Sequence, residues 1–466
     1  MADRRPYQAP LIEPLTFTAV SKHLAADILP GTEFDEDYET ADLLDRFGSP
    51  LFIVSESTLR SLYRGFCACF TEASIDTRVA YSYKTNYLPA VCAILHEEGA
   101  WAEVVSGMEY SLARALGVPA NEIIFNGPYK TRNELETALG EGAIVNVDGF
   151  DDLAAVAQVA ATLGRPARMG IRINFRHGPA PWTKFGFNDE NGDSQRALEQ
   201  IAGDPNLALE LLHNHSGTFL LFHDVYAKAA DVLIDAAKRA RELGLAPTTV
   251  NFGGGYPSTN RLKPVYDVPG GTSLKGDILF PFAEAICSRV SRAKELFGGR
   301  PILMLEPGRA LVDSAVQLAC TVIAKKDIPG QGKALVVDAG VNLVPTAYWY
   351  DHKVDSRPRD DGSRPADDGR TDESMEPVNI YGPLCMQIDV LRERALLPPT
   401  RVGEPVVISN VGAYCQTQSM QFIQPRPATV LLGPEGPEVI RRRETWRDIF
   451  LRDAIPQRLR HHDFAF

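Results

Sequence analysis

The sequence lacks the features that mark several classes of protein. Its 48 lysines and arginines are outnumbered by 60 aspartates and glutamates, a net charge of −12, which argues against nucleic-acid or anionic-membrane partners. No run approaches the ~18 apolar residues of a membrane span, and the N-terminus lacks a signal-peptide core. The seven cysteines are scattered and odd in number, so they do not indicate a disulfide framework. We therefore expect a cytoplasmic protein, and 466 residues suffice for two domains.

Short β-type runs alternate with helical patterns in the first two thirds of the chain. Eight strands separated by helices predict parallel pairing, and eight is the number that closes a (β/α)₈ TIM-type barrel. An open, doubly wound sheet is the alternative topology. The eight runs are TRVAYSYK (77–84), AWAEVVS (100–106), NEIIFNG (121–127), AIVNVDG (143–149), RMGIRIN (168–174), LALELLHNHSG (207–217), TVNFGGG (249–255) and PILMLEPG (301–308).

The pattern changes after residue 310, where β-type runs are separated by turns with little helical pattern between them. This predicts an α/β barrel over residues 45–309 and a C-terminal, mainly β domain over 310–466. Residues 1–44 contain the β-type run LIEPLTFTAV and are expected to join the β domain. Residues 352–377 are almost all charged, proline or glycine, so they predict a mobile surface loop.

Polar residues gather at the carboxyl ends of the predicted barrel strands, where barrels build their active sites. Lys84 is either an ordinary strand-end lysine with a buried stem or a desolvated amine of lowered pKa that forms a Schiff base. Gly253, Gly254 and Gly255 form either a simple turn or a phosphate cradle, and Arg309 leaves the adjacent strand at the same rim. A Schiff-base lysine, a phosphate cradle and an acid that pairs with a pyridinium nitrogen together indicate pyridoxal 5′-phosphate.

Eight ordered motifs resemble those of the fold-type III pyridoxal-phosphate decarboxylases, the family of the ornithine, arginine and diaminopimelate decarboxylases, with alanine racemase as a distant relative. The resemblance covers residues from about 45 to about 430. The motifs are YSYKTN, WAEVVSGMEY, KFGF, HNHSGT, NFGGGYP, EPGR, YGPLCMQID and GAY.

The resemblance implies a role for each matching residue. Lys84 would hold the cofactor as a Schiff base, Glu306 would pair with the pyridine nitrogen, and His215 would stack on the ring. Glu103 stands where the family usually has aspartate near that histidine, and Arg172 would approach the phenolic oxygen. The phosphate would be bound by Gly253, Gly254, Gly255, Arg309, Thr218 and Tyr414, with Thr218 in place of the usual serine.

Cys385, in the motif GPLC, distinguishes decarboxylases from racemases in this resemblance. It would come from the neighbouring subunit of a homodimer and protonate the α-carbon of the quinonoid after CO₂ leaves, whereas alanine racemases use a tyrosine. The alternative is a small buried hydrophobe, as most free cysteines are. We expect no metal site, because Cys67 and Cys69 are two residues apart on a helical stretch and do not face one another.

The substrate is less well defined. Met386 follows Cys385, where ornithine-type enzymes have aspartate and diaminopimelate decarboxylases have glutamate. The segment NLVPTAYWYD also lacks the arginine with which diaminopimelate decarboxylases hold the distal carboxylate of their substrate. Diaminopimelate is therefore disfavoured. Asp351, in a YDH motif like that of ornithine decarboxylases, either contacts a distal ammonium or anchors the following loop. A basic amino acid and a neutral or carrier-attached one both stay open.

The sequence thus predicts a pyridoxal-phosphate-dependent decarboxylase that acts on an L-amino acid as a homodimer. Two alternatives use the same scaffold. One is an amino-acid racemase or epimerase, and the other is a silent regulator, against which the intact Lys84, Glu306 and Cys385 argue.

Overall fold

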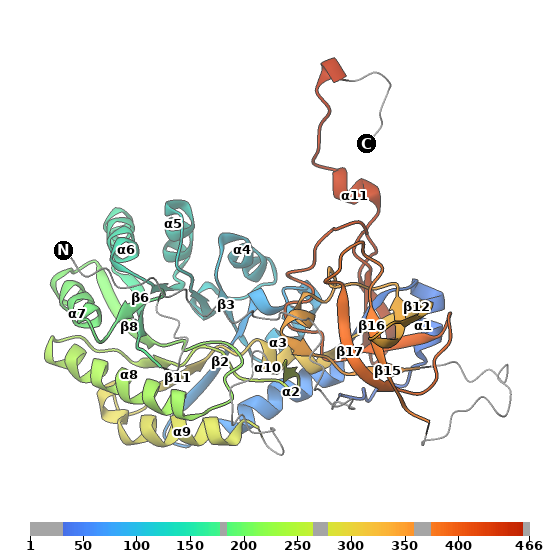
Figure 1. Cartoon of the computed structure of the whole chain (residues 1–466). Helices are drawn as coiled ribbons and strands as arrows, with labels where there is room; N and C mark the ends of the chain where they lie inside the picture. The colour runs from blue at the N-terminus through green and yellow to red at the C-terminus, as the bar shows by residue number, and fades with distance from the viewer. Residues whose placement is uncertain (1–30, 178–183, 264–277, 358–373, 460–466) are drawn as a thin grey trace, which may run out of the picture.

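The computed structural model describes residues 31–177, 184–263, 278–357 and 374–459. Within them the chain forms a barrel and a β domain that lie side by side, and a C-terminal arm stands off the β domain (Figure 1). Residues 11–20 and most of the charged segment 352–377 lie outside the described residues. No described helix is long and apolar enough to cross a membrane.

All eight predicted barrel strands form, and they close on themselves. Each pairs in parallel with its neighbours in the order β5-β4-β3-β2-β11-β9-β8-β6, and β5 also pairs with β6. This confirms the closed barrel and excludes the open sheet. The strands are β2 (Asp76–Ser82), β3 (Trp101–Val104), β4 (Ile123–Phe125), β5 (Ile144–Val147), β6 (Ala167–Asn174), β8 (Leu207–His213), β9 (Thr249–Asn251) and β11 (Ile302–Leu305).

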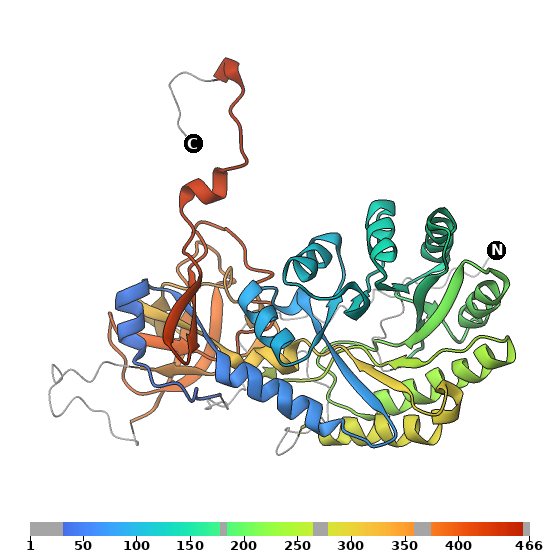
Figure 2. The same ribbon diagram turned by 180° about the vertical axis from the view of Figure 1, so that it is seen from behind.

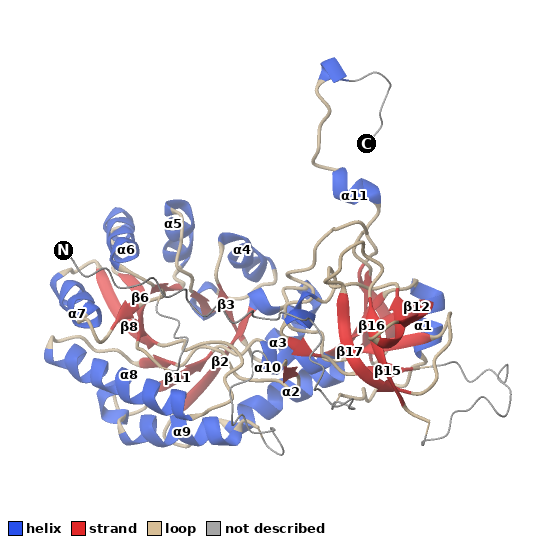
Figure 3. Ribbon diagram, in the orientation of Figure 1, coloured by secondary structure: helices blue, strands red, loops and turns tan. Residues whose placement is uncertain are grey.

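Helices cover the outside of the barrel (Figure 3). Helix α8 shows why: Tyr226, Leu233 and five alanines recur at helical spacing and are buried, so one apolar face packs inward while charged residues face water. The covering helices are α2 (Glu56–Cys69), α3 (Pro89–Glu97), α4 (Gly107–Ala115), α5 (Arg132–Glu141), α6 (Phe150–Leu163), α7 (Asp193–Gly203), α8 (Asp224–Glu242) and α9 (Phe280–Arg292).

The β domain is built on a twisted sheet in the order β17-β16-β13-β12-β1-β19-β20, with β18 pairing β12 and β15. This confirms the predicted mainly β domain. Its strands are β12 (Val316–Ile328), β13 (Gly332–Val337), β15 (Val354–Ser356), β16 (Glu376–Tyr381), β17 (Val390–Leu397), β18 (Pro405–Ile408), β19 (Ala428–Gly433) and β20 (Gly436–Arg441), joined by β1 (Leu51–Ser55).

Strand β1 departs from the domain boundaries that the sequence suggested. It lies within the range assigned to the barrel, yet it pairs antiparallel with β12 and parallel with β19. All five of its residues are buried, because the strand is covered on both faces and an apolar run of this kind fits any sheet centre. Helix α2 then carries the chain from the β domain to the barrel (Figure 2).

The residues before β1 also pack on the β domain. Helix α1 (Thr40–Phe47) precedes β1, and Phe34 and Tyr38 pack against the same apolar cluster as Leu51. The Tyr38 hydroxyl donates to Gln317 on β12 at 2.9 Å. The described part of the N-terminal segment therefore extends the β domain.

Candidate active site

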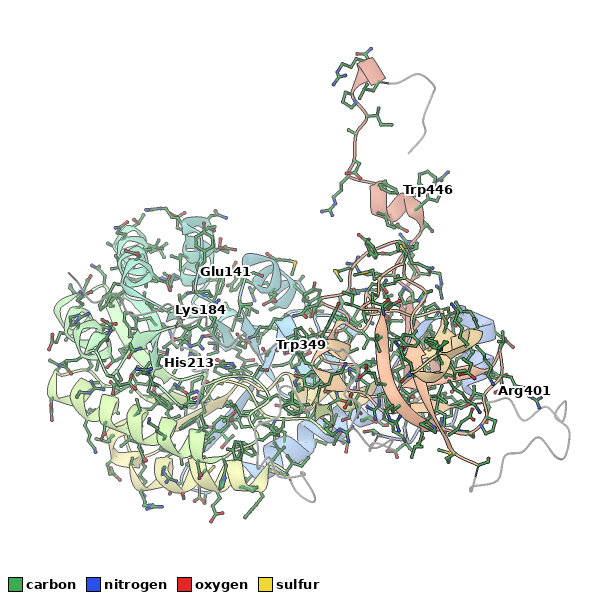
Figure 4. All side chains as sticks on the ribbon, in the orientation of Figure 1. Glu141, Lys184, His213, Trp349, Arg401 and Trp446 are labelled. Atoms are coloured by element: carbon green, nitrogen blue, oxygen red, sulfur yellow. The ribbon has the colours of Figure 1, made fainter. Side chains whose placement is uncertain are left out.

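A cavity of about 860 Å³ opens where the carboxyl ends of the barrel strands meet the β domain. Its wall takes residues from the barrel and, after residue 340, from the β domain. Trp349, on the β-domain side, lies between the two domains in Figure 4. Eight of the residues predicted from the sequence line the cavity: Lys84, His215, Thr218, Gly254, Gly255, Glu306, Arg309 and Tyr414.

Lys84 lies in the short 3₁₀ turn (Tyr83–Thr85) that follows β2. Its Nζ donates to Glu103 Oε2 at 2.5 Å, and 37% of its side chain remains exposed toward the cavity. Burial lowers the pKa of Lys84, but the carboxylate of Glu103 and other negative groups outweigh it and leave the pKa above its ordinary value. The expected lowered pKa is therefore wrong for this state, because the sequence did not reveal the lysine's contact with Glu103.

A buried hydrogen-bonded network lies beneath the cavity and fixes two carboxylates. Asn126 Nδ2 donates to Glu103 Oε1 at 3.0 Å and to Glu306 Oε1 at 2.9 Å. Asn251 Nδ2 donates to the same Glu306 oxygen at 2.6 Å, and Asn146 donates to Asn126 Oδ1 at 2.9 Å. Glu103, Asn146 and Asn251 lie on β3, β5 and β9, while Asn126 and Glu306 directly follow β4 and β11. One side chain from each of these five strands therefore joins the network.

The surroundings of Glu306 favour its ionised form. Burial raises the pKa of Glu306, but His213, Asn126 and Asn251 outweigh burial and hold that pKa below its ordinary value. His213, at the end of β8 inside the barrel (Figure 4), places Nε2 3.5 Å from Glu306 Oε2. Glu306 therefore offers the cavity a carboxylate that is negative at neutral pH.

His215 is held as a neutral imidazole. Burial, together with Arg172 and Lys84, lowers the pKa of His215 well below its ordinary value. The backbone N–H of Gly254 donates to its Nδ1 at 2.9 Å, so the other ring nitrogen carries the proton. Arg172 donates to the backbone carbonyl of His215 at 2.9 Å and lies 4.6 Å above the ring of Phe185.

His213, His215 and Glu306 also present ligand atoms within 4.8 Å of one another. Such a set could hold a metal ion in another protein. Here the positive charges of Lys84 and Arg172 act on the same histidine, and their repulsion disfavours a divalent cation.

The glycine loop and Arg309 form another part of the cavity wall. A Cβ on Gly254 would lie 2.5 Å from the Glu306 carbonyl oxygen, and one on Gly255, at φ +98°, 2.5 Å from that of Gly217. Only glycine allows this close approach. Gly253 supports the loop, because its N–H donates to Asn251 Oδ1 at 2.8 Å.

Arg309 is suited to bind an anion in this part of the cavity. Its Nη1 is buried and makes no hydrogen bond within the described part of the chain, while Asp313 lies 3.6 Å away. The guanidinium carbon lies 5.2 Å from the ring centre of Tyr414. A buried, unused donor beside a glycine loop matches a phosphate, so these residues fit the phosphate of pyridoxal phosphate. Lys84 would then hold its aldehyde, and Glu306 would pair with its ring nitrogen.

Asp351 is engaged elsewhere. It lies on β14 (Tyr350–Asp351), which pairs with β10 (Arg261–Leu262). One carboxylate oxygen lies 3.0 Å from Arg261 and the other 3.0 Å from Arg392, and the side chain is 2% exposed. Asp351 does not line the cavity, although its neighbour Tyr350 does.

Cys385 and Met386 lie in the turn between β16 and β17, away from the cavity wall of their own chain. Cys385 is exposed, so the alternative of a buried structural cysteine is wrong. Met386 packs in part against the apolar core. Asp389 stabilises this turn, because it accepts from the backbone N–H groups of Leu384 and Val341, each at 2.8 Å.

The sequence analysis missed several residues that the structure brings to the site. Asn146 and Asn251 each lie on a barrel strand, and a polar side chain in an apolar strand run is the signal that could have identified them. Asn126, by contrast, is recognisable from the sequence as a polar residue at the end of a predicted strand. The aromatic wall of the cavity, made by Phe219, Trp349 and Tyr350, has no comparable sequence signal, since isolated aromatics are usually part of the core.

Comparisons with known proteins agree with this geometry. The family model described as "Pyridoxal-dependent decarboxylase, pyridoxal binding domain" matches residues 59–313. The diaminopimelate decarboxylase of Methanocaldococcus jannaschii is 29% identical over 93% of this chain and 97% of its own, and that of Bacillus subtilis is 27% identical over 87% and 92%.

Solved structures give the same result. The crystal structure of the M. jannaschii diaminopimelate decarboxylase in complex with L-lysine superposes with a TM-score of 0.81 at 28% identity, covering 93% of this chain and 98% of that one. The Vibrio vulnificus lysine/ornithine decarboxylase shares the fold, with a TM-score of 0.68 at 22% identity over 84% of this chain. With its closed barrel and more than half of its length matched by the family model, this chain belongs to the pyridoxal-dependent decarboxylases and is a pyridoxal-phosphate-dependent amino-acid decarboxylase.

Proposed function

We propose that the protein removes the carboxyl group of an L-amino acid at a site shared by the two subunits of a homodimer. The observation that supports this most is the separation of two reactive groups. Lys84 lines the barrel cavity, whereas Cys385 is exposed on the β domain and does not line the cavity of its own chain. A second subunit can bring its own Cys385 to that cavity, whose wall already includes β-domain residues of the first subunit.

The residues of the chain have separate tasks in this proposal. When bound, pyridoxal phosphate supplies an electron sink for the electron pair left on the α-carbon as CO₂ departs. Glu306, kept ionised by Asn126, Asn251 and His213, holds a proton on the ring nitrogen. The neutral His215 packs on the ring face, and the partner subunit's Cys385 delivers a proton to the α-carbon.

Mixing two inactive variants tests the shared site. Lys84→Ala loses the covalent anchor of the cofactor, and Cys385→Ala loses the proton donor. Heterodimers of the two contain one site that lacks both groups and one intact site, so twofold symmetry predicts about half of the wild-type activity per heterodimer. CO₂ release is measured after subunit exchange has been verified by mass. If verified heterodimers regain nothing, Cys385 does not serve the partner's site.

The same assay distinguishes a racemase. A racemase returns the α-proton without loss of CO₂, so chiral analysis of recovered substrate would show both enantiomers and no gas. We expect stoichiometric CO₂ and unreacted L-substrate. A racemised substrate without CO₂ would overturn the decarboxylase mechanism.

The substrate is best identified from a panel of amino acids. The similar enzymes act, by name, on diaminopimelate, so diaminopimelate belongs in the panel. We propose a basic or neutral substrate instead, for two reasons. Met386, next to Cys385, carries no charge, and the segment around Val344 contains no arginine that could bind the distal carboxylate of diaminopimelate. Release of CO₂ from diaminopimelate in preference to lysine, ornithine, arginine and neutral amino acids would overturn this choice.

Asn126 gives a prediction about the network itself. In the wild type, Asn126 donates hydrogen bonds to both Glu103 and Glu306. Asn126→Asp keeps the volume of the side chain but places a third carboxylate between these two. A like charge raises the pKa of Glu306, so the acidic limb of the kcat/KM profile should move to higher pH. Asn126→Leu removes the donor instead, and we expect kcat/KM to fall about tenfold to hundredfold, since hydrogen bonds to charged groups contribute roughly 1.5–3 kcal/mol.

The matched control is Asn206→Asp, at a half-buried position in the turn before β8, where the asparagine Nδ2 donates to Asp204 Oδ1 at 2.9 Å. It should leave the pH profile unchanged. An Asn126→Asp enzyme with wild-type activity at every pH would show that Asn126 does not position Glu306.

A further inference from the structure

The C-terminal arm (residues 445–459) has no buried residue and extends away from both domains. Figures 1 and 2 show it standing off the β domain in opposite views, and Trp446 marks its base in Figure 4. Its helix α11 (Trp446–Phe450) is capped locally by Thr445 and Asp448, and Arg442 pairs with Asp448. These contacts stabilise the arm's own shape without covering its surface.

The arm carries large apolar side chains in this exposed position. Phe450 is 44% exposed, Leu451 75% and Leu459 45%. Phe450 and Leu451 are consecutive, and grouped exposed apolar residues mark an interaction surface more often than an isolated one does. The body of the chain does not cover these residues, so another molecule is the natural source of contact.

The arm starts beside the Cys385 turn, which faces the second subunit in the proposed dimer. Arg443 and Glu444, at its base, line the same small hollow as Pro383 and Leu384, which directly precede Cys385. Glu444 is fixed there by Arg426 at 3.1 Å. If the partner's cavity receives Cys385, the base of the arm lies at the edge of the same interface.

The charge of the arm and its base also fits a second copy of this chain. Residues 441–459 hold six arginines and three acidic residues, whereas the whole chain has a net charge of −12. A basic segment on an acidic protein is complementary to the remaining surface of an identical molecule. Fifteen residues can also reach far, up to roughly 50 Å if extended.

We propose that the C-terminal arm is a clasp that packs on the second subunit of the homodimer beside the Cys385 turn. The proposal rests on the shared-site dimer of the preceding section and adds the element that holds the two subunits together. The arms act in pairs, since twofold symmetry gives each subunit one clasp and one surface that receives it.

The test compares the dimer dissociation constant of full-length variants by sedimentation velocity over a dilution series. Phe450→Ser/Leu451→Ser and a chain ending at residue 444 should each raise that constant at least tenfold. At protein concentrations that restore the dimer, activity per site should return. The control is Leu163→Ser, an apolar residue 37% exposed at the end of α6 on the barrel, which should leave the constant unchanged.

A photo-crosslinking residue in place of Leu451 identifies the surface that the arm contacts. We expect a product of twice the chain mass. A crosslink within one chain, or variants whose dissociation constants equal that of wild type, would overturn the clasp while leaving the shared site standing. A wild-type protein that is monomeric at every concentration would overturn both.

Discussion

Lys84→Ala is expected to lower kcat/KM by on the order of a thousandfold or more, and to leave a protein that borohydride cannot link to its cofactor. Lys84 lines the cavity, and its amine donates to Glu103. In the proposed mechanism Lys84 anchors the cofactor covalently, and the other residues of the site offer no substitute for that bond. For comparison, a single positioned proton-transfer group contributes about 10²–10⁴-fold to the rate.

The measurement is spectroscopic as well as kinetic. Wild type loaded with pyridoxal phosphate should be yellow, and borohydride should fix the cofactor to the chain, as mass spectrometry detects. Lys184, at the barrel rim in Figure 4 with its amine 4.7 Å from the ring of Phe185, supplies the control Lys184→Ala, which should keep both properties. Covalent cofactor on the Lys84→Ala protein after borohydride would assign the anchor to another lysine.

Asp351→Asn is expected to reduce the free energy of unfolding by about 3–5 kcal/mol, the usual cost of removing one partner of a buried ion pair. Its carboxylate bridges Arg261 and Arg392, and the side chains of Asp351 and Arg392 are only 2% and 3% exposed. The substitution leaves the shape unchanged and removes the charge that both guanidiniums face. Arg392 is nearly inaccessible to water, so its unpaired charge should account for most of the lost stability.

Urea unfolding and KM values together distinguish the two roles that the sequence left open for Asp351. We expect a lower midpoint and little change in KM for any substrate. Asp231→Asn, which breaks an exposed ion pair with Arg289, is the control and should cost less than about 1 kcal/mol. An Asp351→Asn protein of normal stability whose KM rises for diamino acids alone would make Asp351 the residue that recognises a distal ammonium.

The fold was accessible from the sequence because its signals are local. Each of the eight barrel strands is a short, largely apolar run with a polar residue at or near its carboxyl end, and the rule that parallel strands point the same way brings those ends together. The relation of Lys84, Glu306 and Arg309 to one cavity follows from that rule alone. The amphipathic pattern of α8 is equally local.

The interactions that sequence reasoning missed depend on distant partners. Asp351 is held by Arg261 and Arg392, which reach it through the pairing of β10 with β14 and the fold of β17, and no local pattern encodes those pairings. Likewise, the pKa of Lys84 depends on Glu103 from the next strand. The apolar run LFIVS predicts a buried strand but not which of two sheets receives it.

The position of β1 bears on the order in which the protein folds during synthesis. Leu51 pairs with Ala319 and with Ala428, both made long after it. At about 5–20 residues per second, the ribosome needs roughly ten seconds to a minute to supply these partners. During that time the barrel sequence emerges complete, while the four apolar residues of strand β1, Leu51–Val54, have no sheet to join. The nascent chain thus presents an unpaired strand that chaperones can bind, and the β domain can close only once the last strands have left the ribosome.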